Sequence, residues 1–143
     1  MTDLGNTVWM ASLATGGQLH VLSPDAVVDP EAVAAYLAEH RIDGFKVVPS
    51  HLAALTAAAG MDRLIPAGSV VLGGEAASVS WVRQLVAAAG DRRVFNHYGP
   101  TETTIGVATA ELTTVGEVVP IGSPIANTRL YVLDAALAPV PVG

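Results

Sequence analysis

Strand-like and helix-like segments alternate along this sequence, and the alternation restricts the possible folds more than any other feature. Short apolar runs typical of strands are GFKVV (44–48), SVVLGG (69–74) and RVFN (93–96). Runs with helical spacing of apolar residues lie at 29–42, 50–60 and 78–90. Strands that alternate with helices of this length pair in parallel, because each helix carries the chain back across the sheet. The sequence therefore predicts an α/β fold, a parallel sheet flanked by helices.

Residues that start and stop helices support these boundaries. Asp29 is placed to cap the first helix, with Pro30 at its first position. Ser50 is the predicted cap of the second helix and Gly60 its stop. The late segment TRLYVLD (128–134) alternates in the manner of a strand, so we expect a C-terminal β-hairpin segment there.

Three polar or glycine-rich stretches follow the predicted strands. They are PSHL, GGEA and NHYGPTE. Parallel sheets bind ligands in a crevice at the carboxyl ends of their strands. We therefore expect these stretches to meet along one edge of the sheet.

Composition excludes several classes of partner. The 143 residues, 51% of them apolar, are enough for one domain and argue against disorder. A net charge of −6 without a basic run argues against a nucleic-acid partner. No apolar stretch reaches the roughly 18 residues that a membrane span needs. The absence of cysteine excludes disulfides and is compatible with the cytoplasm, which is the expected location.

The loop NHYGPTETT concentrates an unusual number of hydrogen-bonding groups in nine residues. It contains an aromatic ring, a hydroxyl and a carboxylate in the order Tyr98, Thr101 and Glu102. Such groups could stack a base, contact a phosphate and hold Mg²⁺, which often uses one or two carboxylates together with substrate phosphates. The alternatives are a β-turn around Pro100, with Thr101 as a helix cap, and a simple turn for LGGEA. The motifs GxxxxGK[ST], GxGxxG, GxSxG and HExxH are absent, and the histidines lack metal-ligand spacing.

These motifs resemble those of one known family. NHYGPTETTIGVAT is similar to the signature of the adenylation domains of nonribosomal peptide synthetases, in the adenylate-forming superfamily. VPIGSPIANTRLYVLD, VVLGGEA, FKVVPSHLAAL and NTVWMASLATGGQLHVLS resemble other segments of these domains, so the resemblance covers essentially the whole chain. It implies that residues 1–143 are a single, flavodoxin-like substrate-binding subdomain, a fragment of the larger N-terminal core.

The resemblance also implies roles for residues around ATP. Thr101 would contact the α-phosphate and Glu102 would hold Mg²⁺, as the catalytic pair. The residues on the adenine side would be Gly73, Gly74, Glu75, Ala76, Asn96 and Tyr98, with Tyr98 stacked on the base.

The implied reaction joins a small carboxylic acid to AMP and then loads the acyl group onto the phosphopantetheine thiol of a downstream carrier protein. The family's phosphate loop, ribose-binding aspartate and catalytic lysine match nothing in this chain. We therefore expect the rest of the core and its C-terminal subdomain to be partners, and the fragment alone to be inactive.

The resemblance places the acyl pocket as well. Its candidates are Gly5, Asn6, Trp9, Lys46, Val71, Gly73, His97, Ile105 and Gly106. Amino-acid-activating members have an aspartate where Gly5 falls, so an α-keto or other amine-free acid is the expected substrate. The alternatives are an ordinary α-amino acid with Asp3 as acceptor, and a free-standing, non-catalytic binding module. Lys46 either faces the pocket or forms a structural ion pair, and His97 is expected to be a packed wall residue.

Overall fold

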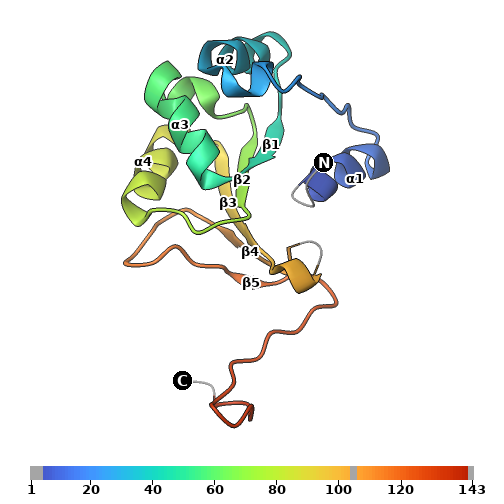
Figure 1. Cartoon of the computed structure of the whole chain (residues 1–143), viewed down its shortest axis with the longest axis vertical. Coiled ribbons are helices and arrows are strands. Elements are labelled where there is room, and N and C mark those ends of the chain that lie inside the picture. The colour runs from blue at the N-terminus through green and yellow to red at the C-terminus, as the bar shows by residue number, and fades with distance from the viewer. Residues whose placement is uncertain (1–4, 104–105, 142–143) are drawn as a thin grey trace.

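The computed structural model describes residues 5–103 and 106–141 (Figure 1). Its helices are α1 (Asn6–Ala14), α2 (Pro30–Glu39), α3 (Pro49–Ala59) and α4 (Val79–Ala89), with short 3₁₀ helices η2 (Ala26–Val28), η3 (Asp62–Leu64) and η4 (Thr101–Thr103). Its strands are β1 (Gly44–Val47), β2 (Ser69–Gly73), β3 (Arg93–Tyr98), β4 (Ala108–Glu111) and β5 (Ser123–Pro124). In the described part of the chain, no helix is long and apolar enough to cross a membrane.

The sheet has the order β1-β2-β3-β4-β5 and is mixed. β1, β2 and β3 pair in parallel, as the alternation of helices and strands predicts. β4 and β5 pair in antiparallel fashion with their neighbours, so the all-parallel prediction holds only for the first three strands. Residues 99–107 connect β3 to β4. A connection this short permits only antiparallel pairing, because a parallel return needs about a dozen residues or more. The α/β class is confirmed.

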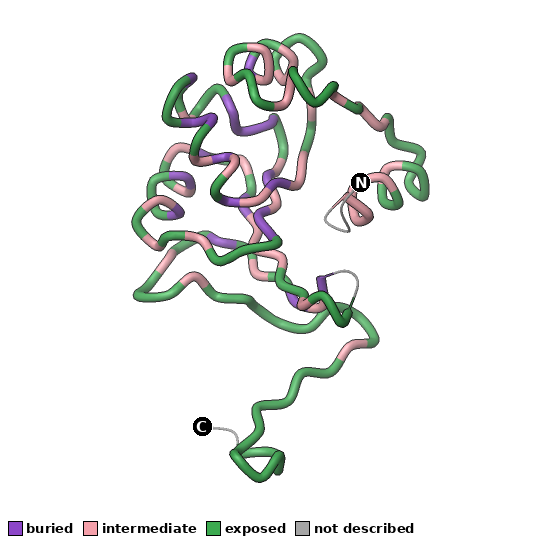
Figure 2. Tube along the Cα trace, viewed as in Figure 1, coloured by how far each residue is buried: buried purple, intermediate pink, exposed green. Residues whose placement is uncertain are grey.

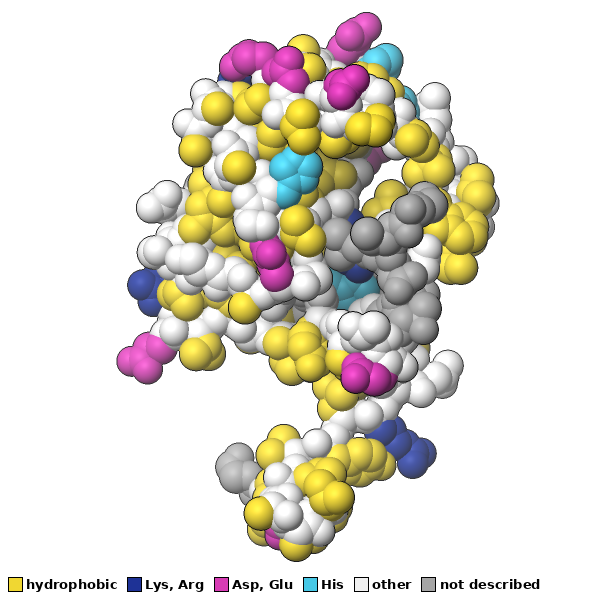
Figure 3. Space-filling view, viewed as in Figure 1, with side chains coloured by type: hydrophobic (Ala, Val, Ile, Leu, Met, Phe, Trp, Pro, Cys, Tyr) yellow, Lys and Arg dark blue, Asp and Glu magenta, His cyan; other side chains and the backbone are white. Residues whose placement is uncertain are grey.

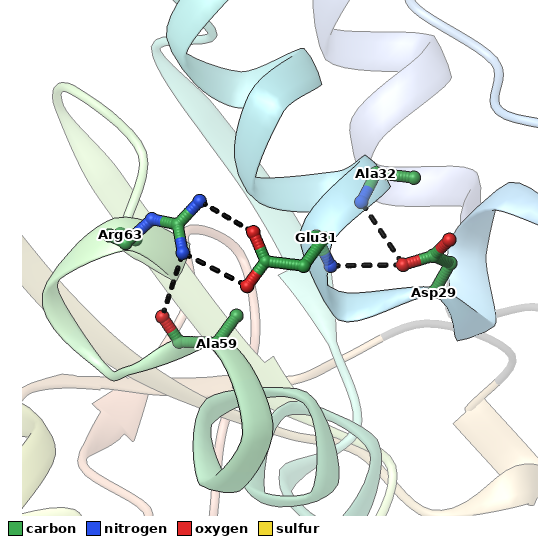
Figure 4. Close-up of polar contacts among 5 residues, drawn as sticks. All are labelled: Asp29, Glu31, Ala32, Ala59 and Arg63. Carbon is green, nitrogen blue, oxygen red and sulfur yellow. Dashed lines mark hydrogen bonds and ion pairs between the residues drawn. The ribbon is translucent and has the colours of Figure 1, made fainter.

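Local sequence signals account for most helix ends. The Asp29 carboxylate accepts hydrogen bonds from the backbone N–H of Glu31 at 3.0 Å and of Ala32 at 3.2 Å, which caps α2 as predicted (Figure 4). Gly60 ends α3 with φ = +89°, a conformation that glycine adopts at low cost. Ser50 is not the cap of α3, because the helix begins at Pro49 and its N-cap is Val48. Proline suits that first position, where no N–H is needed.

α2, α3 and α4 cover one face of the sheet and bury the hydrophobic core between the two layers (Figures 1 and 2). Leu72 and Val70 from β2 are completely buried, and Val94 from β3 is 2% exposed. Successive side chains of a strand point to opposite faces. Lys46 and Val71, which are register partners, therefore point to the other face, which none of these helices covers.

The C-terminal segment forms a chain reversal without a ladder of strands. Leu133 pairs with Pro139 in an isolated antiparallel bridge, and Val140 N–H donates to Val132 C=O at 3.0 Å. The strand predicted over 128–134 is otherwise absent, and almost all of this segment is exposed (Figure 2). A two-stranded hairpin is marginal in water without an apolar surface to pack on, which explains the single bridge.

Candidate functional site

The carboxyl ends of the three parallel strands lie side by side and bring the predicted polar loops together. Val47, the last residue of β1, pairs with Leu72 of β2. Gly73, the last residue of β2, pairs with His97 of β3. The backbone N–H of Ser50 donates to the Glu75 carboxylate, which joins the PSHL loop to the GGEA loop. Hydrogen bonds from Ser50 lower the pKa of Glu75, so this carboxylate stays ionised as an acceptor. The clustering predicted for these loops is confirmed.

A cleft of about 460 Å³ opens at this edge, between the GGEA loop and the end of β3. Five of the six residues predicted on the adenine side line it: Gly74, Glu75, Ala76, Asn96 and Tyr98. Gly73 ends β2 directly before them and does not line the cleft. Tyr98 is 42% exposed, so part of its ring is open to solvent beside the cleft.

The opposite wall of the cleft comes from the connection between β4 and β5, which the sequence interpretation did not assign to the site. Glu117, Val118, Val119 and Ile121 line this wall. The Asn96 side-chain amide donates to the Pro120 C=O at 2.8 Å and holds the wall against β3. The similarity of VPIGSPIAN to the family is the only sequence signal for this wall. Asn96 therefore also supports the cleft's architecture.

Thr101 and Glu102 follow the cleft on η4, and both are exposed. The short helix is closed by a bond from Thr103 Oγ1 to Pro100 C=O at 2.8 Å. Among the described residues, no three histidine, cysteine or acidic side chains form a group that could hold a metal ion. A lone accessible carboxylate such as Glu102 still fits Mg²⁺ that is bound mainly through nucleotide phosphates and water.

A second cluster lies on the uncovered face of the sheet and joins three distant segments. Lys46 Nζ from β1 donates to Thr7 Oγ1 of α1 at 3.2 Å and lies 2.9 Å from His97 Nδ1 of β3. α1 lies apart from the other helices (Figure 1), and basic and histidine side chains are visible between it and the main body (Figure 3). The space between α1 and this face of the sheet is called the recess. Lys46 and His97 are both half-buried.

The pKa values of Lys46 and His97 are both shifted by their surroundings in the recess. Burial lowers the pKa of Lys46. Burial and then the Lys46 charge lower the pKa of His97, while a backbone hydrogen bond with Gly106 opposes them. The Nδ1 atom of a neutral His97 accepts a hydrogen bond from the Lys46 ammonium group. Gly106 fits against the ring because it lacks a side chain: a Cβ there would lie 2.1 Å from His97 Nε2.

The pocket candidates therefore fall into two groups. Lys46, Val71, His97 and Gly106 lie close together at the recess. The three candidates from the chain start have local roles. Gly5 is the N-cap of α1, and Trp9 Nε1 donates to Asn6 Oδ1 at 3.0 Å.

Two further points concern the predicted pocket. Thr7, which the sequence interpretation missed, is the α1 residue that contacts Lys46. The sequence signal for Thr7 would have been the spacing of small polar residues along α1, a helix that was not predicted. Ile105 and Asp3 lie outside the described residues.

The fold and the cleft define an α/β domain of the class in which ligands bind at the carboxyl ends of the strands. A family model for AMP-binding enzymes matches residues 2–143, and the chain belongs to this family. The predicted resemblance to adenylation domains is confirmed by its relatives and structural neighbours.

The curated relatives include large peptide synthetases. The chain is 34% identical over 149 residues to bacitracin synthase 3 of Bacillus licheniformis, in an alignment that covers 99% of this chain and 2% of that protein. It is 33% identical over 136 residues to malpinin synthetase of Mortierella alpina, covering 92% of this chain and 2% of that protein. The chain thus spans a small part of the length of these relatives.

Solved structures agree with the sequence relatives. The nonribosomal peptide synthetase FmoA3 with bound α-methyl-L-serine-AMP superposes with a TM-score of 0.85 at 27% identity, covering 97% of this chain and 16% of that chain. A four-domain nonribosomal peptide synthetase bound to AMP and glycine gives 0.75 at 31% identity, covering 88% of this chain and 9% of that chain.

Proposed function

We propose that residues 1–143 form the acyl-selecting subdomain and part of the ATP and Mg²⁺ site of a peptide-synthetase adenylation domain. The observation that carries this proposal is that one residue, His97, belongs to both the cleft and the recess. His97 lines the cleft at the strand ends and also contacts Lys46 in the recess. A nucleotide in the cleft and an acid in the recess would meet beside His97.

The proposed reaction follows from this placement. A carboxylate oxygen of the acid forms a bond to the α-phosphorus of ATP, and the bond from that phosphorus to the bridging oxygen breaks, so pyrophosphate leaves with its electron pair. The nucleophile is already ionised and needs no general base. Tyr98 would stack on adenine, Thr101 would donate to the α-phosphate and Glu102 would hold Mg²⁺. The metal, when bound, neutralises charge on the phosphates.

Partners follow from the same proposal. The acyl-adenylate would pass its acyl group to a phosphopantetheine thiol on a carrier protein, in the cytoplasm. A structural neighbour described as containing adenylation and PCP domains supports this partner; its 24% identity and TM-score of 0.82 speak for a shared fold. The rest of the adenylation core and its C-terminal subdomain would supply the phosphate loop, the ribose aspartate and the catalytic lysine. We therefore propose that the chain alone is inactive.

The substrate's α-substituent depends on the register at the start of the chain. An amine-free acid follows if Gly5 stands where amino-acid-activating relatives have aspartate, and Trp9 is then the pocket residue four positions later. The α1 residue that contacts Lys46 is instead Thr7. A register with Thr7 in that place moves the aspartate position to Asp3. This observation favours an α-amino acid as the candidate substrate, with the amine-free acid as the alternative.

The test uses the complete adenylation domain that contains this sequence. We expect ATP–pyrophosphate exchange that depends on an added acid and on Mg²⁺. Glu102→Gln, which keeps the size of the side chain and removes its charge, should keep the fold and reduce exchange by roughly 100-fold or more, which is the scale of losing one electrostatic contact in the transition state. Glu39→Gln, at the exposed end of α2 and away from the cleft, is the matched control.

Two results would contradict the proposal. The absence of exchange with every acid tested would remove the adenylation activity itself. A Glu102→Gln domain with an unchanged rate and an unchanged Mg²⁺ requirement would remove the metal role alone. Comparing exchange for leucine and 4-methyl-2-oxopentanoate decides between the amino-acid and amine-free alternatives.

A further inference from the structure

Lys46 differs from the paired cations of this chain in what surrounds it. Among the described residues, three arginines form ion pairs: Arg63 with Glu31 and Arg93 with Glu111, both at 2.8 Å, and Arg92 with Asp62. The described partners of Lys46 are neutral, a threonine hydroxyl and an imidazole nitrogen. No described carboxylate lies within ion-pair distance of its ammonium group.

A cation in this position is unfavourable unless an anion joins it. Withdrawing an ammonium group from water costs free energy that neutral partners only partly offset. Lys46 is half-buried and is the only lysine of the chain. Burial lowers its pKa, and no carboxylate in the described part of the chain forms an ion pair with it. A titratable group whose pKa is shifted by burial in a recess is a candidate for a binding site.

The hydrogen bonds in the recess leave one N–H of Lys46 and the hydroxyl proton of Thr7 available to a ligand. An ammonium group has three N–H donors, and the described contacts with Thr7 and His97 occupy two of them. The Thr7 hydroxyl accepts from Lys46, so its own proton can be donated elsewhere. His97 is held between Lys46 and Gly106 and keeps the ammonium in place. The recess thus offers an N⁺–H and an O–H donor, a combination suited to a carboxylate.

We propose that Lys46 and Thr7 bind an anionic group on the side chain of the acyl substrate, so that the domain activates an acid with a second carboxylate. The inference rests on the adenylation activity proposed above. The reacting carboxylate does not fit this position, because it must reach the nucleotide in the cleft beyond His97 and remain free to attack. The Lys46 ammonium lies 2.9 Å from His97, which also lines the cleft, so a substrate with an anion at each end can address both sites.

The experiment measures kcat/KM for pyrophosphate exchange by the complete adenylation domain with paired acids. The panel is L-aspartate with L-asparagine, L-glutamate with L-glutamine, 2-oxoglutarate with 4-methyl-2-oxopentanoate, and L-leucine. We expect the best dicarboxylic acid to exceed its neutral partner by about 100-fold or more, because a site built for a hydrogen-bonded charge strongly rejects an analogue that lacks it.

Two variants test the assignment to Lys46. Lys46→Met keeps the length of the side chain and removes its charge, and it should reduce the acid-to-neutral ratio to near one. Because this ratio is taken within one protein preparation, partial unfolding does not change it. Arg63→Met removes an exposed cation from the helix-covered side and should keep the wild-type ratio.

The outcomes separate the two proposals. Exchange with neutral acids in preference to dicarboxylic acids would overturn the inference and leave the adenylation activity in place. An unchanged ratio in Lys46→Met would also overturn it, and a loss of stability with that unchanged ratio would identify Lys46 as a structural ion-pair partner. No exchange with any acid would overturn both proposals. If Lys46→Met does not fold, the wild-type panel alone decides.

Discussion

The two faces of the central sheet are built from the same strands and have opposite characters. The face toward α2, α3 and α4 carries Val70, Leu72 and Val94, each no more than 2% exposed. The opposite face carries Lys46 and His97, which are half-buried and bonded to each other. Alternation of side chains along a strand is what separates the two sets. The difference teaches that one face stabilises the domain while the other carries half-buried polar groups, where we propose that substrate binds.

The first prediction contrasts adjacent residues of β2 and carries the largest expected effect. Leu72→Ala should lower the free energy of unfolding by about 2–5 kcal/mol, because it leaves a cavity in the packed layer. Val71→Ala, one position earlier on the other face, should cost less than about 1 kcal/mol, because a half-exposed side chain leaves no sealed cavity. Urea unfolding followed by circular dichroism measures both. Equal costs would show that the second face is packed as tightly as the first.

The second prediction concerns the contact between Gly106 and His97. Gly106→Ala would place a Cβ 2.1 Å from His97 Nε2, so the imidazole must move away from Lys46. We expect a loss of about 1–3 kcal/mol in the free energy of unfolding, typical of overpacking, and a changed NMR signal of the His97 ring. Gly116→Ala is the control, because a Cβ at Gly116 meets nothing within 4 Å. Equal effects in both variants would contradict a rigid recess.

The third prediction, with the smallest effect, concerns pH. Burial and the Lys46 charge lower the pKa of His97 in the folded state, so the unfolded chain takes up this proton first as the pH falls below about 6.5, the ordinary histidine value. The free energy of unfolding should therefore decrease as the pH falls through this range. His97→Asn should show a shallower decrease in urea unfolding, since the other histidines are unchanged. Identical pH curves for the two proteins would contradict the lowered pKa.

Local signals made most of the helix-covered half predictable. Asp29 and Pro30 mark the start of α2, Gly60 marks the end of α3, and apolar spacing marks β2, so each element could be read from a few neighbouring residues. The loops after the parallel strands were also predictable as one site, because strand direction alone brings them together. α1 was missed because it lacks a cap side chain and buries no residue.

The sequence by itself determined the start of α2, the end of α3, the three parallel strands and the identity of the loops at their ends, because these depend on backbone preferences and on the periodicity of apolar residues. Only the tertiary structure decided that β4 returns in antiparallel fashion, that residues 117–121 close the cleft, and that Thr7 meets Lys46. Lys46 and Thr7 are separated by 39 positions and by an intervening helix. No periodicity connects such residues, because their contact arises from packing between elements.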